Sequence, residues 1–271
     1  GYSYAARFTK RGVSESVLLN CAVKNVQNAK LAEDGFYRVE LPSSLYNCSL
    51  AANINTTEFY YSVIPKSMKD LYVSLGMAKY ERPNVMHGLE NRQILKNMLC
   101  VRYQSDKKGI TVNEDALPVG YTYDKIMHKE DYDSLTPLER QAALLEYAVL
   151  DEDGEKILEQ QEKTFENGKS PSDDTITHGD LKITESDRAS YKGSRLKGKK
   201  HGKINLKFRT EKKSETYLVL KGLSSRSKVR KKQILSVKSK KARFEIPMCA
   251  VSNEKEMNRD FIAVNLGVAQ M

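Results

Sequence analysis

A capped amphipathic helix, reached directly from a Leu-Pro-Val-Gly-Tyr strand, places the strongest constraint on what this chain can fold into. Thr136 is the expected N-cap, Pro137 takes the first helical position, and Glu139 completes a capping box. The apolar stripe that follows has three- and four-residue spacing and consists of Leu138, Ala142, Leu145 and Val149. The pattern predicts a helix of about four turns that packs one face against a core.

The first 150 residues combine helical and extended patterns, which predicts an α+β domain over 1–150. Helices are expected at 14–27, 67–76 and 90–98. In the second of these, Asp70 stands at a capping-box position and Gly76 marks the C-terminal stop. Strands are expected at 36–41, 100–104 and 119–123. Together these strands would form a small sheet beneath the helices.

After the capped helix, an acidic turn at 151–154 opens a polar linker that is expected over 151–172. Acidic residues follow the spacing of a calcium loop that begins at Asp151, but Lys156 holds the sixth position, where that loop needs glycine. The cysteines share no C-x-x-C spacing and are expected as buried thiols, and the histidines lack the H-E-x-x-H spacing. We therefore predict a solvated acidic turn, no metal site and no cofactor.

Residues 173–271 contain short apolar runs separated by clusters of turn residues, which is typical of β-structure. Strict alternation from 203 to 209 would place Ile204, Leu206 and Phe208 on one sheet face and the cations on the other. Further strands are expected at 217–220, 233–237, 242–246 and 260–266. Short strands separated by turn clusters predict an all-β sandwich of jelly-roll type, a fold that by itself does not specify a function.

Charge is distributed unevenly along the chain. From Arg188 to Arg243 there are 21 Lys or Arg residues and two acids, so the remainder holds 24 of the 45 basic and 33 of the 35 acidic residues. Such asymmetry indicates either internal complementarity or a polyanionic partner. The segment 192–202 is expected to be a loop that contacts such a partner. The predicted residues for binding an anionic polymer are Lys197, Lys199, Lys200, Lys203, Lys207, Arg209, Arg230, Lys231 and Lys232.

Three interpretations of these cations remain open. They can form a solvated face without a ligand, contact an anionic wall polymer or lipid headgroups, or bind nucleic acid. Clustered Lys and Arg release counterions from any phosphate chain, so charge alone does not separate these ligands. The sequence has no helix-turn-helix, zinc-finger or RRM signature and interleaves few aromatic residues with the cations, which disfavours nucleic acid.

Several short segments, taken in order, resemble the extracytoplasmic region of the bacterial YfhO family of membrane proteins. The matching segments are FYRVE at 36–40, NCSL at 47–50, LCVRY at 99–103, LPVGY at 117–121 and LERQAALL at 138–145. The family's members are polytopic and are similar to membrane-embedded glycosyltransferases of the GT-C type, which act on lipid-linked sugars outside the cell. No apolar run here approaches the roughly 20 residues that cross a bilayer. The resemblance implies that membrane helices flank this segment in the parent protein.

The resemblance implies a soluble extracytoplasmic portion of a membrane protein, at the extracytoplasmic face of the cell membrane. Its expected role is to bind or position a cell-surface acceptor such as lipoteichoic acid, or a lipid-linked saccharide, for a glycosyltransferase. The catalytic residues are expected elsewhere in the parent protein, close to its membrane helices, so this chain alone would not be catalytic. The alternatives are a structural or partner-docking ectodomain without a ligand, and a polyanion-binding module.

Overall fold

The computed structural model describes residues 21–29, 31, 35–42, 47–61, 63–77, 85–160, 164–172, 176–177, 179–193, 195–210, 214–223, 234–239, 243–247 and 261–269. The helices are α3 (Cys21–Asn28), α4 (Cys48–Ala51), α5 (Lys66–Ser74), α6 (Gln93–Met98), α7 (Lys129–Ser134), α8 (Pro137–Glu146) and α9 (Glu152–Gln160). The strands up to residue 167 are β1 (Arg38–Glu40), β2 (Glu58–Tyr60), β3 (Val85–His87), β4 (Val101–Asp106), β5 (Gly109–Val112), β6 (Lys125–His128), β7 (Ala148–Leu150) and β8 (Glu166–Asn167). The later strands are β9 (Leu181–Lys192), β10 (Arg195–Phe208), β11 (Ser214–Lys221), β12 (Ile234–Lys238), β13 (Arg243–Pro247) and β14 (Phe261–Ala269).

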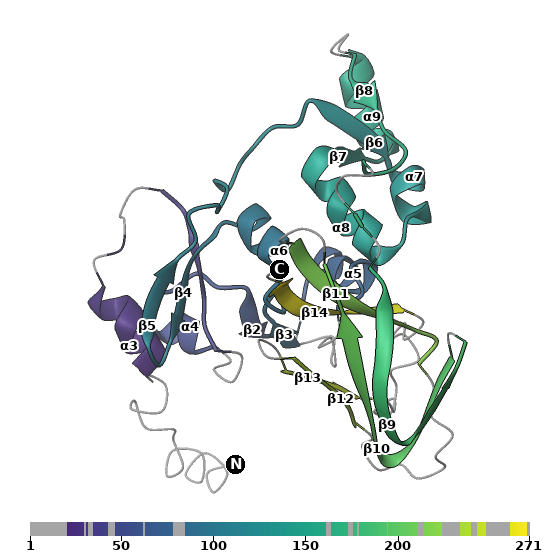
Figure 1. Cartoon of the computed structure of the whole chain (residues 1–271). Helices are drawn as coiled ribbons and strands as arrows, with labels where there is room; N and C mark the ends of the chain where they lie inside the picture. Colours follow the sequence, from purple (N-terminus) through teal and green to yellow (C-terminus); the bar gives the residue numbers. More distant parts are fainter. Residues whose placement is uncertain are drawn as a thin grey trace, which may run out of the picture.

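A three-stranded sheet in the order β1-β4-β5 forms the first part of the fold (Figure 1). β1 pairs with β4 in parallel and β4 with β5 antiparallel. Side chains of β4 alternate, so Val101, Tyr103 and Ser105 are buried while their neighbours are more exposed. The apolar cluster on this sheet also takes Val23 from α3 and Val39 from β1. α3 therefore covers the sheet and closes a small local core.

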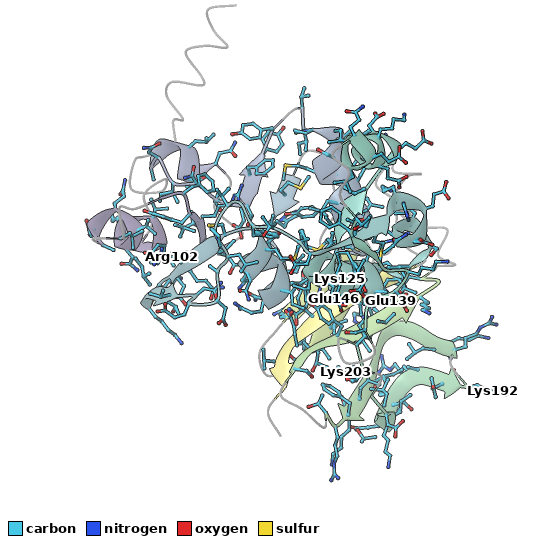
Figure 2. The ribbon with its side chains drawn as sticks, turned by 90° about the horizontal axis from the view of Figure 1, so that it is seen from above. Arg102, Lys125, Glu139, Glu146, Lys192 and Lys203 are labelled. Carbon is cyan, nitrogen blue, oxygen red and sulfur yellow. The ribbon has the colours of Figure 1, made fainter. Side chains whose placement is uncertain are left out.

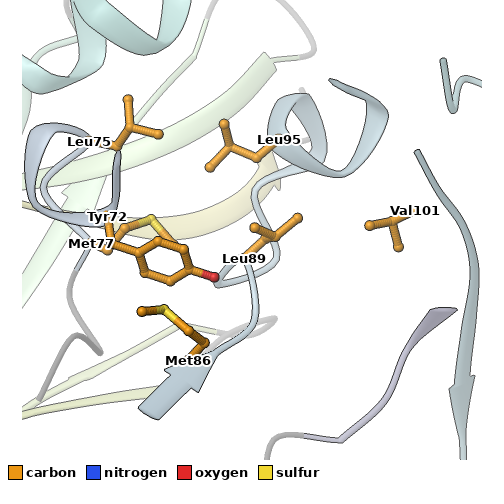
Figure 3. Packing of buried hydrophobic residues seen from close by; sticks show 7 residues of the cluster. All are labelled: Tyr72, Leu75, Met77, Met86, Leu89, Leu95 and Val101. Carbon is orange, nitrogen blue, oxygen red and sulfur yellow. The ribbon is translucent and has the colours of Figure 1, made fainter. Parts of the chain in front are cut away.

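A second apolar cluster lies between α5, β3 and α6 (Figure 3). It consists of Tyr72, Leu75, Met77, Met86, Leu89, Leu95 and Val101. The turn after α5 needs glycine, because Gly76 has φ of +59° and a Cβ there would lie 3.1 Å from Cδ1 of Phe261. Ala263 in β14 donates its backbone N–H to the carbonyl of Gly76 at 3.0 Å. The C-terminal strand β14 therefore pairs with the edge of the apolar cluster that α5, β3 and α6 form.

The region around α8 has its own small parallel sheet, in the order β7-β6-β8. Met127 of β6 packs against α7 and α8 in a cluster with Tyr132, Ala143 and Tyr147. α7, α8 and α9 lie around this sheet (Figure 1). The arrangement explains why residues 125–128 form a strand: both neighbours pair with β6 in parallel, and its central side chain is fully buried.

The C-terminal strands form separate antiparallel pairs, β9–β10, β11–β14 and β12–β13. Two of these pairs share an apolar cluster, in which Phe244 and Ile246 of β13 meet Ile262 and Val264 of β14. The strands predicted at 203–209, 217–220, 233–237, 242–246 and 260–266 are confirmed over their described residues as parts of β10 to β14, except that β10 ends at Phe208. An α+β fold with a β-rich C-terminal region is confirmed, whereas the jelly-roll sandwich and the domain boundaries at 150 and 172 stay predictions.

The capped helix begins as predicted but ends early. The capping box of Thr136 and Glu139 is present, with the Thr136 N–H donating to Oε2 of Glu139 at 2.7 Å. α8 ends at Glu146, because Tyr147 is extended and the chain continues as β7, which includes Val149. The expected stripe is wrong in part: Leu145 is 42% exposed, while Ala142 and Ala143 are buried. The helix turns a different set of residues toward the core than spacing alone indicates.

Two further predictions in this half are wrong. Residues 119–123 are not a strand: they are an extended connection without ladder partners, and Val119 is exposed. The acidic segment 151–154 is not a simple turn, because it opens α9. Asp151 accepts the backbone N–H of Gly154 through Oδ1 at 3.0 Å, and acidic residues in the first turn favour a helix at that end.

The other early helices agree with prediction in outline. The expected helix 14–27 is seen as α3 from residue 21, and residues 1–20 lie outside the described residues. α5 has Pro65 as its N-cap, so no capping box with Asp70 forms, but the stop at Gly76 is confirmed. α6 begins at Gln93 instead of residue 90, because Glu90 and Asn91 have positive φ and cannot continue a helix.

Candidate functional site

The predicted cations that the structure describes gather on one long hairpin, made of β9 and β10 and called here the basic arm. Lys197, Lys199, Lys200, Lys203 and Lys207 lie on β10 and Arg209 follows it, and all six are exposed. Arg230, Lys231 and Lys232 lie outside the described residues. The two strands make their tertiary contacts chiefly with each other, and the arm ends well away from the rest of the molecule (Figure 1).

The base of the basic arm is amphipathic in the way that the sequence predicts. Ile204 and Leu206 are half-buried while Lys203 and Lys207 on the alternate positions are exposed. Acidic residues of β9 lie on the same face as these lysines, since Asp187 is the cross-strand partner of Lys203. The neighbouring pair is hydrogen-bonded, with Nδ2 of Asn205 donating to Oε2 of Glu185 at 2.6 Å. Positive charge at the base is therefore partly offset within the hairpin.

The distal part of the arm carries positive charge without this compensation. From residue 188 to residue 200 the chain has six Lys or Arg residues and no Asp or Glu. They are Arg188, Lys192, Arg195, Lys197, Lys199 and Lys200, and each is exposed. Lys192 lies at the outer limit of the molecule and Lys203 much closer to the body (Figure 2). The end of the arm is thus a compact, solvent-facing cationic surface.

An irregular stretch bends the arm between its base and its tip. The register changes between Gly198 and Lys203, and both Arg188 and His201 have positive φ. Gly202 is required at this bend, because a Cβ there would lie 2.7 Å from the carbonyl oxygen of Arg188. The prediction of a loop at 192–202 is wrong, since most of these residues belong to the strands. Lys199 and Lys200 lie within this irregular stretch and are exposed.

A second polar assembly, missed by the sequence analysis, is buried and centres on Arg92, whose side chain is 0% exposed. Its Nη1 donates to the carbonyl of Leu75 at 2.8 Å and to Oε1 of Gln141 at 3.0 Å. Its Nη2 donates to the carbonyl of Ala263 at 3.0 Å and lies 3.6 Å from Oε2 of Glu90. One guanidinium therefore connects α5, α8 and β14.

Tyr217 and Glu215 of β11 extend this assembly. The hydroxyl of Tyr217 accepts from Nε2 of Gln141 at 2.9 Å, and its ring lies 5.4 Å from Cζ of Arg92. Burial, reinforced by the nearby Glu215 carboxylate, raises the pKa of Tyr217 well above its ordinary value. Glu215 accepts the backbone N–H of Gln93 at 2.6 Å, so it caps the start of α6 from a strand far along the chain. Most polar groups of the assembly bond to one another, as expected of a structural junction, although Nε of Arg92 has no hydrogen-bond partner among the described residues.

No sign of a metal centre appears in the part of the chain that the structure describes, where no three His, Cys, Asp or Glu side chains converge. The calcium-loop spacing that begins at Asp151 falls on a helix. His128 contacts Glu155 through Nδ1 and Oε1, which fastens the start of α9 to the end of β6. Cys48 and Cys100 are buried thiols, as the sequence analysis expects, and burial raises the pKa of Cys48.

The family model described as bacterial membrane protein YfhO matches residues 8–270. The chain belongs to the YfhO family. The match spans the capped helix, the buried Arg92 junction and the whole basic arm. No curated protein and no solved structure matches the chain.

Membership of the YfhO family makes this a chain of a bacterial membrane protein. Within the described residues, none of the helices is both long and apolar enough to cross a bilayer. What the YfhO domain does present is the exposed cationic arm. The gathering of Lys197, Lys199, Lys200, Lys203 and Lys207 on β10, with Arg209 directly after it, is therefore the feature on which a function can be argued.

Proposed function

We propose that this chain is the extracytoplasmic portion of a GT-C-like glycosyltransferase that modifies a cell-surface polymer, and that the basic arm binds the polymer. The observation that carries the proposal is the run of six exposed cations from residue 188 to residue 200, which no acidic residue interrupts. A phosphate polymer such as lipoteichoic acid offers a matching row of negative charges. Clustered Lys and Arg bind such chains by releasing condensed counterions.

The shape of the basic arm supports an extended ligand over a small one. Cations are spread over the strands and the bend instead of converging on a pocket, and their side chains face solvent. A surface of this kind holds a flexible polyanion through several weak contacts and lets it slide. The arm would therefore position the acceptor, while sugar transfer would take place elsewhere in the parent protein. We expect no glycosyl transfer by this chain alone.

Calorimetric titration of the 271-residue chain with lipoteichoic acid, at low and at raised salt, tests this proposal. We expect binding at low salt that weakens as salt rises, because the contacts depend on counterion release. The double variant Lys199→Ser/Lys200→Ser should lower the slope of log affinity against log salt by about 1.4, at about 0.7 per phosphate contact on a single-stranded polyanion. Absence of binding at low salt would refute acceptor binding.

A matched control is available in the same chain. Lys107 and Lys108 are also two adjacent, exposed lysines, and they lie at the β4–β5 turn, away from the basic arm. Lys107→Ser/Lys108→Ser removes the same charge as the arm variant. If binding were due only to net charge, both double variants would lose affinity equally. A larger loss for the arm variant would support a defined binding surface on β10.

A further inference from the structure

The tip of the basic arm carries a pair of apolar side chains that have no place in polymer binding. Tyr191 and Leu196 are cross-strand partners, and they are 52% and 51% exposed. Cross-strand partners project from the same face of an antiparallel ladder. Ala189 and Gly198, the next pair on that face, are small. The distal hairpin therefore presents one exposed aromatic and aliphatic spot to solvent.

Cations lie on the opposite face of the same tip, because side chains alternate along a strand. Lys192 is paired with Arg195 directly beside it, toward the turn, and Lys197 lies on its other side, opposite Ser190. All three cations are exposed, and none has an acidic cross-strand partner. Lys and Arg have long apolar stems, so their charged ends can reach past a shallowly inserted Tyr or Leu to phosphates. The tip thus carries an apolar pair on one face and positive charge on the other, so a hairpin that meets a surface with its end presents both.

Three properties distinguish an anionic bilayer surface from a soluble polyanion as the partner of this tip. Tyr is a residue type that concentrates at the membrane interface, where its ring is apolar and its hydroxyl remains hydrated. Lys and Arg close to an anionic leaflet gain attraction from its surface potential. A phosphate polymer in water, in contrast, offers no apolar phase for Leu196. Family membership also puts the chain in a protein that has a membrane beside it.

We propose that the tip of the basic arm docks on the surface of an anionic lipid bilayer. Tyr191 and Leu196 would lie at the boundary between headgroups and acyl chains, and Lys192, Arg195 and Lys197 would contact lipid phosphates. The arm would then span from the body of the chain to the membrane surface. This inference requires the membrane-protein family and the geometry of the tip, and it does not depend on acceptor binding at the bend.

The chain contains no Trp, which allows a site-specific test. Leu196→Trp introduces a single indole at the tip, and Leu181→Trp introduces one at the base of the same hairpin, where Leu181 is 50% exposed. Each full-length variant is titrated with phosphatidylcholine vesicles that do or do not contain phosphatidylglycerol. We expect a blue shift of Trp emission for Leu196→Trp with the anionic vesicles, and none for Leu181→Trp.

Cosedimentation of variants without the indole provides the second measurement. Tyr191→Ser/Leu196→Ser should weaken binding to anionic vesicles by about tenfold or more, because it removes most of the apolar contact. Leu181→Ser, which removes an equally exposed Leu from the base, should leave vesicle binding unchanged. Each cation removed from the tip should weaken vesicle binding by about fivefold.

The outcomes separate this inference from acceptor binding. No blue shift for Leu196→Trp with anionic vesicles at low salt would overturn membrane docking, and so would an equal shift for the base variant. A vesicle-free glycerol phosphate polymer serves as the third ligand. Binding to that polymer without any binding to vesicles would overturn the docking inference and support the acceptor proposal. Binding to vesicles without any binding to the polymer would support the docking inference and overturn the acceptor proposal.

Discussion

Replacing Arg92 with Met should destabilise the fold more than most single substitutions in this chain. The variant keeps a long unbranched side chain but removes the guanidinium that joins the carbonyls of Leu75 and Ala263 to Gln141. It also removes the cation that lies 3.6 Å from the carboxylate of Glu90, at a site where the Glu90 side chain is only 1% exposed. A buried charge that loses its partner carries a large desolvation penalty.

The size of the effect follows from these contacts. Breaking a buried ion pair from one side costs about 3–5 kcal/mol. A domain has only about 5–15 kcal/mol of stability in total, so the variant should lie close to the limit of folding. With an m value of about 3 kcal/mol/M, the urea midpoint should fall by about 1 to 1.7 M. Unfolding can be followed by far-UV circular dichroism and by Tyr fluorescence.

Two companion variants make this prediction specific. Arg102 is exposed on β4, so Arg102→Met should change stability by no more than about 0.5 kcal/mol. Adding Glu90→Gln to Arg92→Met also removes the buried carboxylate that faced the guanidinium, and the double variant should recover about 1–3 kcal/mol relative to the sum of the two single losses. A loss for Arg92→Met no larger than that for Arg102→Met would refute the reasoning, as would strict additivity with Glu90→Gln.

Three shorter predictions concern other parts of the fold. Gly76→Ala should cost about 1–2 kcal/mol in urea unfolding, because it forces a left-handed Ala whose Cβ would approach the ring of Phe261. Thr136→Ala should cost about 1 kcal/mol by removing the cap of α8, with no change in the spectrum of the folded protein. The raised pKa of Tyr217 means that unfolded chains ionise this phenol first, so stability should fall as pH rises above about 10. Tyr217→Phe should flatten that decline, and an unchanged slope would count against a buried phenol.

Local signals in the sequence predicted the elements whose cause is local. The start of α8 was correct because the capping box and Pro137 act within one helical turn. Its end was not, because the chain at Tyr147 leaves the helix to pair β7 with β6 in parallel, and such pairing depends on residues about twenty positions away. The same holds for 151–160, whose helix packs beside β7 through contacts that no local pattern encodes.

In the candidate site, too, the features with a local cause were predicted and those with a distant cause were missed. Alternation correctly predicted half-buried Ile204 and Leu206 between exposed lysines, because alternation is an intrinsic property of a strand. Phe208, predicted on the same apolar face, is 36% exposed. The partner strand β9 was missed, since most of its residues are exposed and carry no apolar repeat. Arg92 was missed as well, because an Arg next to Glu90 and Asn91 has the appearance of a solvated helix start. Only the positions of Ala263 and Gln141 reveal that its side chain is enclosed.

The reach of Arg92 to the carbonyl of Ala263 has a consequence for how the protein is made. The two residues are 171 positions apart in the chain. At about 5–20 residues per second, a ribosome adds Ala263 roughly 10–30 s after Arg92. Throughout that interval the guanidinium of Arg92 and the backbone of Gly76 lack their partners on β14, which has not yet been synthesised. Nascent chains that stop short of β14 should therefore bind chaperones and be degraded, however well the earlier sheet has formed.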